Sequence, residues 1–197
     1  ELVTSMTRRA MDMLGGRAAA LALVRSGAME TVFVQSTRTH TDKAVMRRLN
    51  TALTEISAQS TEAIVEGDAA TMLSPSLASA LGWENLTTAR LIGADGELFG
   101  ILCIANRDSR LEAIDRNVLQ ALAGHASVAL DNSRLFMRIA QANSQWVEIF
   151  DAISDFIIVH DQNDHVLRVN RSMADFIGIR PAELIGVGMR ALMALAQ

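Results

Sequence analysis

The feature that most constrains the fold is a stretch of forty residues, 114 to 153, that contains no proline and one glycine. Apolar and small side chains recur along it in steps of three and four, the spacing that keeps one face of an α-helix turned toward a partner. This stripe consists of Leu122, Ala126, Ala129, Ser133, Phe136, Ala140, Asn143, Val147 and Phe150. At ~1.5 Å per residue, such a helix is about 60 Å long. We therefore expect a long connecting helix over 113–153 that is shared by two domains.

A second apolar stripe lies about 100° further round the same helix. Its members are Leu135, Ile139, Ala142, Trp146, Ile149 and Ile153. Together the two stripes form an apolar face that is wider than a two-stranded coiled coil needs. This width favours a bundle of several helices.

The residues before this helix alternate between helical and strand patterns. Helical spacing predicts helices over 2–14 and 42–57, and Ser74-Pro75 and Gly82 suit the two ends of a short helix over 75–81. Short apolar or β-branched runs predict strands at 18–24, 31–35, 63–65, 86–92 and 97–105. Asp95-Gly96 is a strong hairpin turn between the last two strands. This order predicts an α+β fold, in which helices cover an antiparallel sheet.

Composition limits the partners that the chain could have. Half of its 197 residues are hydrophobic, enough for one good core and part of a second, so two domains are the upper limit. The net charge is −4, and the chain has no tyrosine and no basic run with which to follow phosphates or stack on bases. We therefore expect no nucleic-acid partner.

The single cysteine allows no internal disulfide, and no apolar run approaches the roughly 20 residues that span a bilayer. We therefore expect a cytoplasmic chain without a membrane segment. The sequence begins at Glu1 and shows no signal-peptide pattern, so we expect it to be a piece of a longer protein.

Two motifs in the first part of the chain carry a family resemblance. One is the run 96–107, Gly-Glu-Leu-Phe-Gly-Ile-Leu-Cys-Ile-Ala-Asn-Arg, and the other is the run 122–135, Leu-Ala-Gly-His-Ala-Ser-Val-Ala-Leu-Asp-Asn-Ser-Arg-Leu. Residues 1–135 thereby resemble a GAF domain, a small-molecule-sensing module of bacterial signalling proteins whose last helix runs on into a signalling helix. The cyclic-nucleotide signature N-K-F-D-E is kept only in part, at Asn106, Arg107, Leu111, Asp115 and Arg116.

The end of the chain resembles the first half of a PAS domain. The run 150–161, Phe-Asp-Ala-Ile-Ser-Asp-Phe-Ile-Ile-Val-His-Asp, fits the entry helix and first strand of that family. The local residue pattern is consistent with this resemblance. Residues 165–169 have a strand pattern, and Asn170 and Gly178 suit the two ends of a helix over 171–177. We expect residues 154–197 to form a truncated PAS fold whose strands leave an unpaired edge.

These resemblances imply a sensory function. A GAF domain, a helix and a PAS domain in this order resemble the input half of a sensor histidine kinase, and diguanylate cyclases and transcription activators carry the same input modules. We expect an unknown small molecule to bind between the sheet and the segment 63–83. The expected lining residues are Phe33, Leu73, Leu77, Trp83, Arg90 and Cys103. The competing interpretation is a dimerisation module that binds no ligand.

Several of these residues have simpler interpretations. Cys103 lies in an apolar strand, where a thiol is usually a small hydrophobe, and Trp83 more often fills a core than lines a cavity. Arg90 lies in a half-buried strand, which favours an internal Asp or Glu partner over an anionic ligand. Arg107 and Asp115 are expected to form a structural ion pair.

No catalytic or metal centre is predicted. The sequence has no Gly-rich phosphate loop and no serine or cysteine nucleophile beside a base in a recognisable motif. One cysteine cannot complete the disulfide cycle on which methionine-sulfoxide-reducing GAF domains rely. His125, His160 and His165 lack companions at metal-ligand spacing, so we assign no metal and no cofactor.

The long helix is also predicted to form a parallel homodimer, because one short N-terminal helix can cover only its early part. In a parallel dimer, both C-terminal domains lie at one end and can feed one output. The expected dimer seam consists of Leu122, Ala126, Ala129, Phe136, Ala140, Val147 and Phe150, with Ser133 and Asn143 as polar positions that fix the register.

Overall fold

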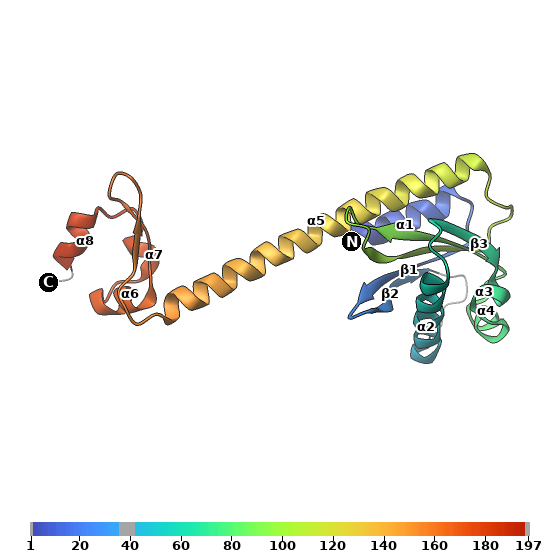
Figure 1. Cartoon of the computed structure of the whole chain (residues 1–197), viewed down its shortest axis with the longest axis horizontal. Coiled ribbons are helices and arrows are strands. Elements are labelled where there is room, and N and C mark those ends of the chain that lie inside the picture. The colour runs from blue at the N-terminus through green and yellow to red at the C-terminus, as the bar shows by residue number, and fades with distance from the viewer. Residues whose placement is uncertain (1, 36–41, 196–197) are drawn as a thin grey trace. The chain divides into compact units, whose positions relative to one another are not determined.

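The computed structural model describes residues 2–35 and 42–195, within two compact units, Glu1–Arg134 and Leu135–Gln197. The first unit contains one five-stranded sheet in the order β2-β1-β5-β4-β3, and every neighbouring pair is antiparallel (Figure 1). The strands are β1 (Ala18–Arg25), β2 (Ala28–Gln35), β3 (Ile64–Asp68), β4 (Asn85–Ile92) and β5 (Leu98–Ala105). The predicted α+β fold with an antiparallel sheet is confirmed.

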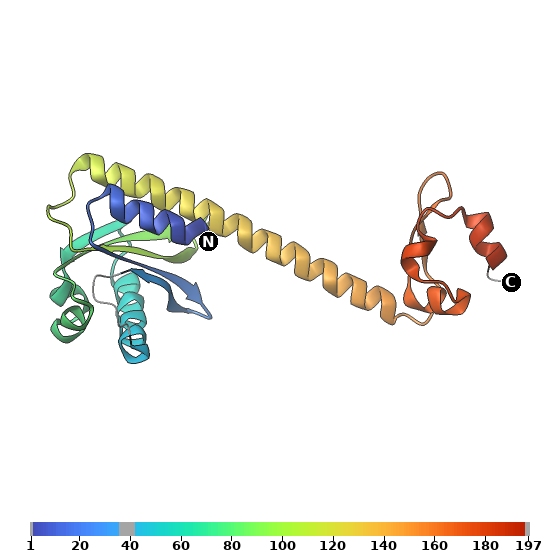
Figure 2. The same cartoon turned by 180° about the vertical axis from the view of Figure 1, so that it is seen from behind.

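Helices cover both faces of this sheet (Figures 1 and 2). On one face, α1 (Leu2–Met13) lies beside the first part of α5 (Ala113–Ala152). On the other face lie α2 (Lys43–Gln59), α3 (Ala69–Leu73) and α4 (Pro75–Leu81). The sheet therefore separates two apolar cores. The core beside α1 and α5 includes Leu21, Leu102, Ile104, Leu119, Ala123 and Ala126, and the core beside α2, α3 and α4 includes Leu49, Leu53, Leu77, Trp83, Ile101 and Cys103.

The central strand β5 contributes to both cores, which explains why its sequence is a continuous apolar run rather than an alternating one. Ile101 and Cys103 point to one core, and Leu102 and Ile104 to the other. Gly100 allows β1 to approach closely, because a Cβ at this position would lie 2.2 Å from the carbonyl oxygen of Ala22.

The prediction of one long helix is confirmed, since α5 runs from Ala113 to Ala152. Ser26 and Gly27 both take positive φ angles and form a two-residue hairpin turn between β1 and β2. Strand β2 therefore begins at Ala28, earlier than the strand predicted at 31–35. Helix α3 was not expected, since five residues are too few to show a helical period; the Asp68 side chain starts it by accepting the backbone N–H of Thr71 at 2.9 Å.

The second unit contains a two-stranded antiparallel sheet and three short helices beyond the end of α5. These elements are β6 (Ile158–His160), β7 (Val166–Val169), α6 (Arg171–Ile177), α7 (Pro181–Leu184) and α8 (Met189–Leu195). Asn170 and Gly178 cap α6 as expected. The core consists of Val166, Val169, Met173, Ala174, Leu184 and Leu192. The assignment of 154–197 to a PAS fold stays a prediction, and its last two residues lie outside the described residues.

Candidate functional site

The structure brings four of the six expected ligand-binding residues into one core. Leu73, Leu77, Trp83 and Cys103 are all buried in the core beside α2, α3 and α4. Phe33 is instead half-buried against the core on the opposite face of the sheet. The sequence could not separate these faces, because the β1–β2 register has an irregularity between Leu21 and Ala22.

The partners of Arg90 differ from the expected carboxylate. Its Nη1 donates to the carbonyl oxygens of Ser57 at 2.9 Å and Ser60 at 2.6 Å, at the C-terminal end of α2. The last carbonyls of a helix lack partners within the helix, and a cation is favoured beside them. Arg90 therefore fastens the end of α2 to β4.

An open groove of about 310 Å³ lies between α2 and the α3–α4 pair. Two of the expected residues, Leu73 and Leu77, contribute to its wall. The rest of the wall comes from Arg47, Arg48, Thr51, Ala52, Glu55 and Ser74. This groove lies between helices rather than between the sheet and 63–83, so the expected ligand site stays a prediction.

Trp83 and Cys103 are packed within the core beside α2, α3 and α4. The indole Nε1 of Trp83 is buried and has no hydrogen-bond partner among the described residues. Burial raises the pKa of the Cys103 thiol to about 12, so the thiol stays protonated and unreactive at neutral pH. Within the described part of the chain, no group of three or more His, Cys, Asp and Glu side chains could hold a metal ion.

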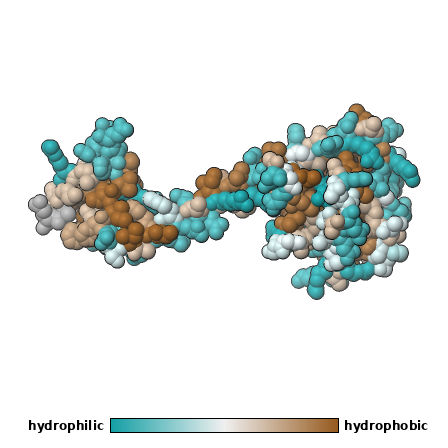
Figure 3. Space-filling view, viewed as in Figure 1, coloured by the Kyte–Doolittle hydropathy of each residue, from teal (hydrophilic) through white to brown (hydrophobic). Residues whose placement is uncertain are grey.

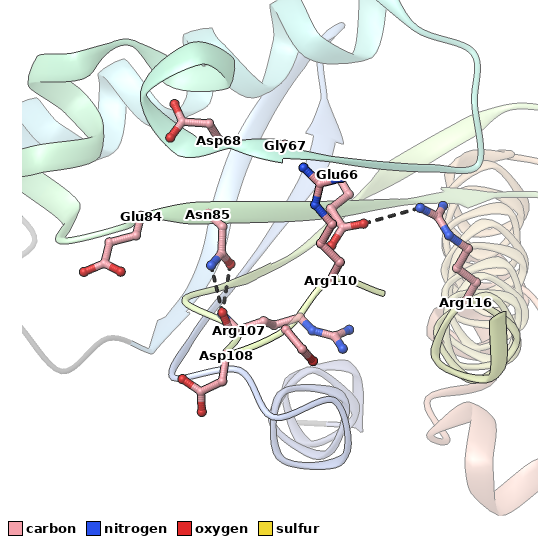
Figure 4. Close-up of a pocket in the computed structure, with 10 residues that line it drawn as sticks. Glu66, Gly67, Asp68, Glu84, Asn85, Arg107, Asp108, Arg110 and Arg116 are labelled. Carbon is pink, nitrogen blue, oxygen red and sulfur yellow. Dashed lines mark hydrogen bonds and ion pairs between the residues drawn. The ribbon is translucent and has the colours of Figure 1, made fainter. Parts of the chain in front are cut away.

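A larger, polar pocket of about 540 Å³ lies where the end of β3, the start of β4 and the connection from β5 to α5 meet (Figure 4). The residues that line it are Glu66, Gly67, Asp68, Glu84, Asn85, Arg107, Asp108, Ser109, Arg110 and Arg116. The sequence singled out Arg107 and Arg116 through a partial family signature, but it gave no sign that Glu66 and Asn85 would join them.

Two asparagines position the start of the β5–α5 connection. Asn106 has a φ of 56°, which asparagine tolerates better than most residues, and its side chain bonds to the backbone N–H of Glu84 and the carbonyl of Gly82. The Asn85 side chain accepts the backbone N–H of Arg107 at 2.9 Å and donates to the Arg107 carbonyl at 2.8 Å. The backbone of Arg107 is therefore fixed on β4.

The Arg107 side chain is buried, and its Nη2 donates to Oδ2 of Asp115 at 2.7 Å, which confirms the expected ion pair. Asp115 also accepts the backbone N–H of Glu112 at 3.2 Å, one half of a capping box at the start of α5. Beside this pair, Glu66 lies 3.4 Å from Nη2 of Arg116 and accepts the backbone N–H of Leu111 at 2.9 Å. The pocket is thus built around the first turn of α5.

The ion pair gives a prediction for the pH dependence of stability. The hydrogen bond from Arg107, helped by the Glu112 N–H, lowers the pKa of Asp115. A lowered pKa in the folded state means that the ionised carboxylate stabilises the fold above its usual pKa of about 3.9, and that this contribution is lost as pH falls through the folded-state pKa. Asp115→Asn should therefore lower stability at about pH 7, and the deficit should shrink toward about pH 3.

Urea denaturation of the variant and the unchanged chain across this pH range, followed by circular dichroism, measures the deficit. Glu112→Gln is the matched control, because this exposed side chain makes no hydrogen bond or ion pair among the described residues. A deficit of equal size at both ends of the pH range would show that the Asp115 charge is not what matters.

The expected dimer-seam residues differ in how far their own chain covers them. Leu122 and Ala126 pack into the core of the first unit, and Phe150 is only 6% exposed and stacks on Trp146 with ring centroids 5.0 Å apart. These three positions are covered within their own chain. Ala129 and Val147 are half-buried, whereas Phe136 and Ala140 are exposed.

No helix in the part of the chain that the structure describes is long and apolar enough to cross a membrane. None of the curated proteins matches the chain. Its fold, however, is shared with solved structures. GAF3 from Synechocystis, solved in its photoproduct state, gives a TM-score of 0.56 at 13% sequence identity over 70% of this chain and 96% of that chain.

A domain of a Sinorhizobium meliloti protein assigned to the two-component sensor histidine kinases gives a TM-score of 0.55 at 13% identity, over 71% of this chain and 95% of that chain. A GAF domain/HD domain protein from Geobacter sulfurreducens gives a TM-score of 0.53 at 11% sequence identity, over 69% of this chain and 94% of that chain. These likenesses concern the fold. A family model for the GAF domain matches residues 1–130, which is most of the chain, and so the chain belongs to the GAF domain family.

Proposed function

We propose that this chain is the sensory input part of a bacterial signalling protein, in which a small ligand in the GAF domain alters the packing of α5. Membership of the GAF family supports this proposal. The structural observation that carries it is the change in burial along α5: Leu119, Ala123 and Ala126 are buried in the domain core, while later turns expose apolar side chains. A helix built in this way can couple the packing of a domain to the packing of a second surface.

That second surface is the proposed dimer seam. Figure 3 shows apolar side chains gathered along the middle of α5. The exposed large apolar residues there are Leu135, Phe136, Met137 and Ile139. Leu135, Phe136 and Ile139 lie within about 100° of one another round the helix, whereas Met137 lies on the far side. Exposed apolar surface of this kind marks an interaction site, and the spacing of three and four along the two sequence stripes fits a second copy of the same helix. We therefore propose a parallel homodimer along this part of α5.

The proposed parent is a cytoplasmic sensor histidine kinase. The fold that the chain shares with a Sinorhizobium meliloti domain of that assignment is consistent with this choice. The input regions of diguanylate cyclases and transcription activators are the alternatives, because such modules precede many kinds of output. The expected PAS assignment of residues 154–197 belongs to this proposal too.

The proposed ligand site is the groove between α2 and the α3–α4 pair, where Leu73 and Leu77 supply apolar wall and Arg47, Arg48 and Glu55 supply charges. A volume of about 310 Å³ lies at the lower end of the range for small-molecule sites. A ligand there would contact the helices that pack against the sheet, and α5 packs against the other face of the same sheet.

Native mass spectrometry of the purified chain tests this site by searching for a co-purifying small molecule. We expect an added mass that disappears in Thr51→Trp, because an indole at this wall position fills the groove. Ala58→Trp is the matched control, since Ala58 is exposed on the same helix and does not line the groove.

An added mass that persists in Thr51→Trp would place the ligand elsewhere. A chain that carries no ligand from cells or after incubation with metabolite extracts would favour the competing proposal, a dimerisation module without a ligand. The burial of Trp83 and Cys103 in the core supports this competing proposal.

A further inference from the structure

One arginine side chain joins α5 to the sheet at the place where the helix leaves the first unit. The guanidinium carbon of Arg134 lies 4.2 Å from the centroid of the Phe99 ring, and Arg134 Nη1 lies 3.3 Å from Oε2 of Glu97. A guanidinium over an aromatic face is attracted by the ring, and the carboxylate beside it adds an ion pair. Arg134 therefore makes two contacts of different kinds with the same end of the β4–β5 hairpin.

The β4–β5 turn that Arg134 contacts is held together by its own interactions. The backbone N–H of Gly93 donates to the Glu97 carbonyl at 2.8 Å, and the backbone N–H of Gly96 donates to the Gly93 carbonyl at 3.0 Å. The tip of the Phe99 ring fills the space beside Gly93, where a Cβ would lie 2.4 Å from the ring Cζ. The turn and the ring therefore form one tightly packed block.

The part of α5 just before this contact is lightly packed. Along α5, which the structure describes throughout, Ser127 is the last buried residue within the first unit. Every side chain in 128–134 is exposed or half-buried, and Leu130 packs only partly against the core. Residues 135–146 are all exposed. Because segments with few buried apolar contacts open most readily, the Arg134 contact is the outermost point at which the first unit holds α5.

We propose that Arg134 is a latch between the β4–β5 turn and α5. When the latch is closed, it fixes the rotation of the helix just before Leu135, and when it opens, the stretch 128–134 separates from the sheet. The contact suits this role because the Arg134 and Glu97 side chains are 30% and 53% exposed, so water and salt compete with it. A breakable contact between two rigid elements gives two discrete states.

The latch lies outside the groove between α2 and the α3–α4 pair and before the exposed middle of α5, so it needs neither a ligand nor a second copy. It also gives the sheet a direct contact with the end of the packed part of the helix. The β4–β5 turn leads into β5, which contributes to both cores. A change of packing on either face of the sheet therefore displaces Glu97 and Phe99 relative to Arg134.

Paramagnetic relaxation measured by NMR on the 197-residue chain tests the latch. A nitroxide attached at Ala94→Cys, an exposed position in the β4–β5 turn, should broaden the backbone amide resonances of α5 around Arg134. The label attaches selectively, because the buried Cys103 thiol has its pKa raised to about 12 and does not react at neutral pH. Mixing the labelled, isotope-enriched chain with an excess of plain chain restricts the measured effect to contacts within one chain.

Arg134→Gln removes both contacts, so the broadening around residue 134 should fall by about half or more as the open state gains population. Glu97→Gln removes the ion pair alone and should give a smaller fall. Arg138→Gln is the matched control, since it makes the same change in charge one turn further along α5. Arg138 is exposed and has no hydrogen bond or ion pair among the described residues, so the broadening should stay unchanged.

The urea concentration at the midpoint of unfolding separates a latch from a purely structural contact. It should be the same in Arg134→Gln and Arg138→Gln, because the latch lies at the edge of the first unit and not in its core. Unchanged broadening in Arg134→Gln, an equal fall in Arg138→Gln, or a fall that accompanies a lower unfolding midpoint would overturn the proposal.

Discussion

The Phe136→Glu variant is expected to sediment as a monomer at concentrations where the unchanged chain sediments as a dimer. The Phe136 side chain is 73% exposed within its own chain, in the middle of the proposed seam. In a parallel dimer, residue 136 meets its symmetry mate across the two-fold axis, so the variant buries two like charges against each other. A penalty of about 4 kcal/mol weakens association about a thousandfold.

Analytical ultracentrifugation over a concentration series measures this change. Gln145→Glu provides the matched control, because residue 145 is exposed and lies about 180° from residue 136 on the helix. It adds the same charge to the same helix and should leave the dimer unchanged. A wild-type chain that sediments as a monomer, or a variant that stays dimeric, would mean that the apolar middle of α5 is not a seam between copies.

The second large effect is expected in the second unit, where Asn170→Ala should unfold the β6–β7 and α6 region. Asn170 is fully buried, and its side chain makes four hydrogen bonds. Its Oδ1 accepts the backbone N–H groups of Ile157 at 3.0 Å and Met173 at 3.2 Å. Its Nδ2 donates to the carbonyls of Ile153 at 2.9 Å and Asp155 at 2.8 Å.

One side chain therefore joins the end of α5, the start of β6 and the first turn of α6. Alanine removes the cap of α6 and leaves the facing backbone groups without partners, at a cost of about 4 kcal/mol. A unit with so small a core has little stability to lose. The loss should exceed that of a typical exposed asparagine several-fold.

Hydrogen–deuterium exchange followed by mass spectrometry can localise the effect. Peptides that cover β7 and α6 should lose protection in Asn170→Ala, while peptides of the first unit should keep theirs. Asn163→Ala is the control, because Asn163 lies exposed in the β6–β7 turn and its side chain makes no hydrogen bond among the described residues. Unchanged protection in β7 and α6 would show that the four hydrogen bonds contribute little.

The sequence by itself determined the elements whose signals are local. The continuous period of three and four over forty residues specified α5 to within a residue at each end, because the signal accumulates over many turns. Asn170 and Gly178 marked the ends of α6, since capping depends on a few neighbouring residues. The same reasoning missed α3, which is too short to repeat.

Only the tertiary structure decided which residues share a site. The order β2-β1-β5-β4-β3 places Glu66 and Asn85 beside Arg107, although 41 and 22 positions separate them from it along the chain. It also decided which apolar residues of α5 remain free, because Leu122 and Ala126 pack into the first core and Phe150 stacks on Trp146. A periodic sequence specifies the faces of a helix, but the surface that each face meets depends on contacts between segments far apart in the chain.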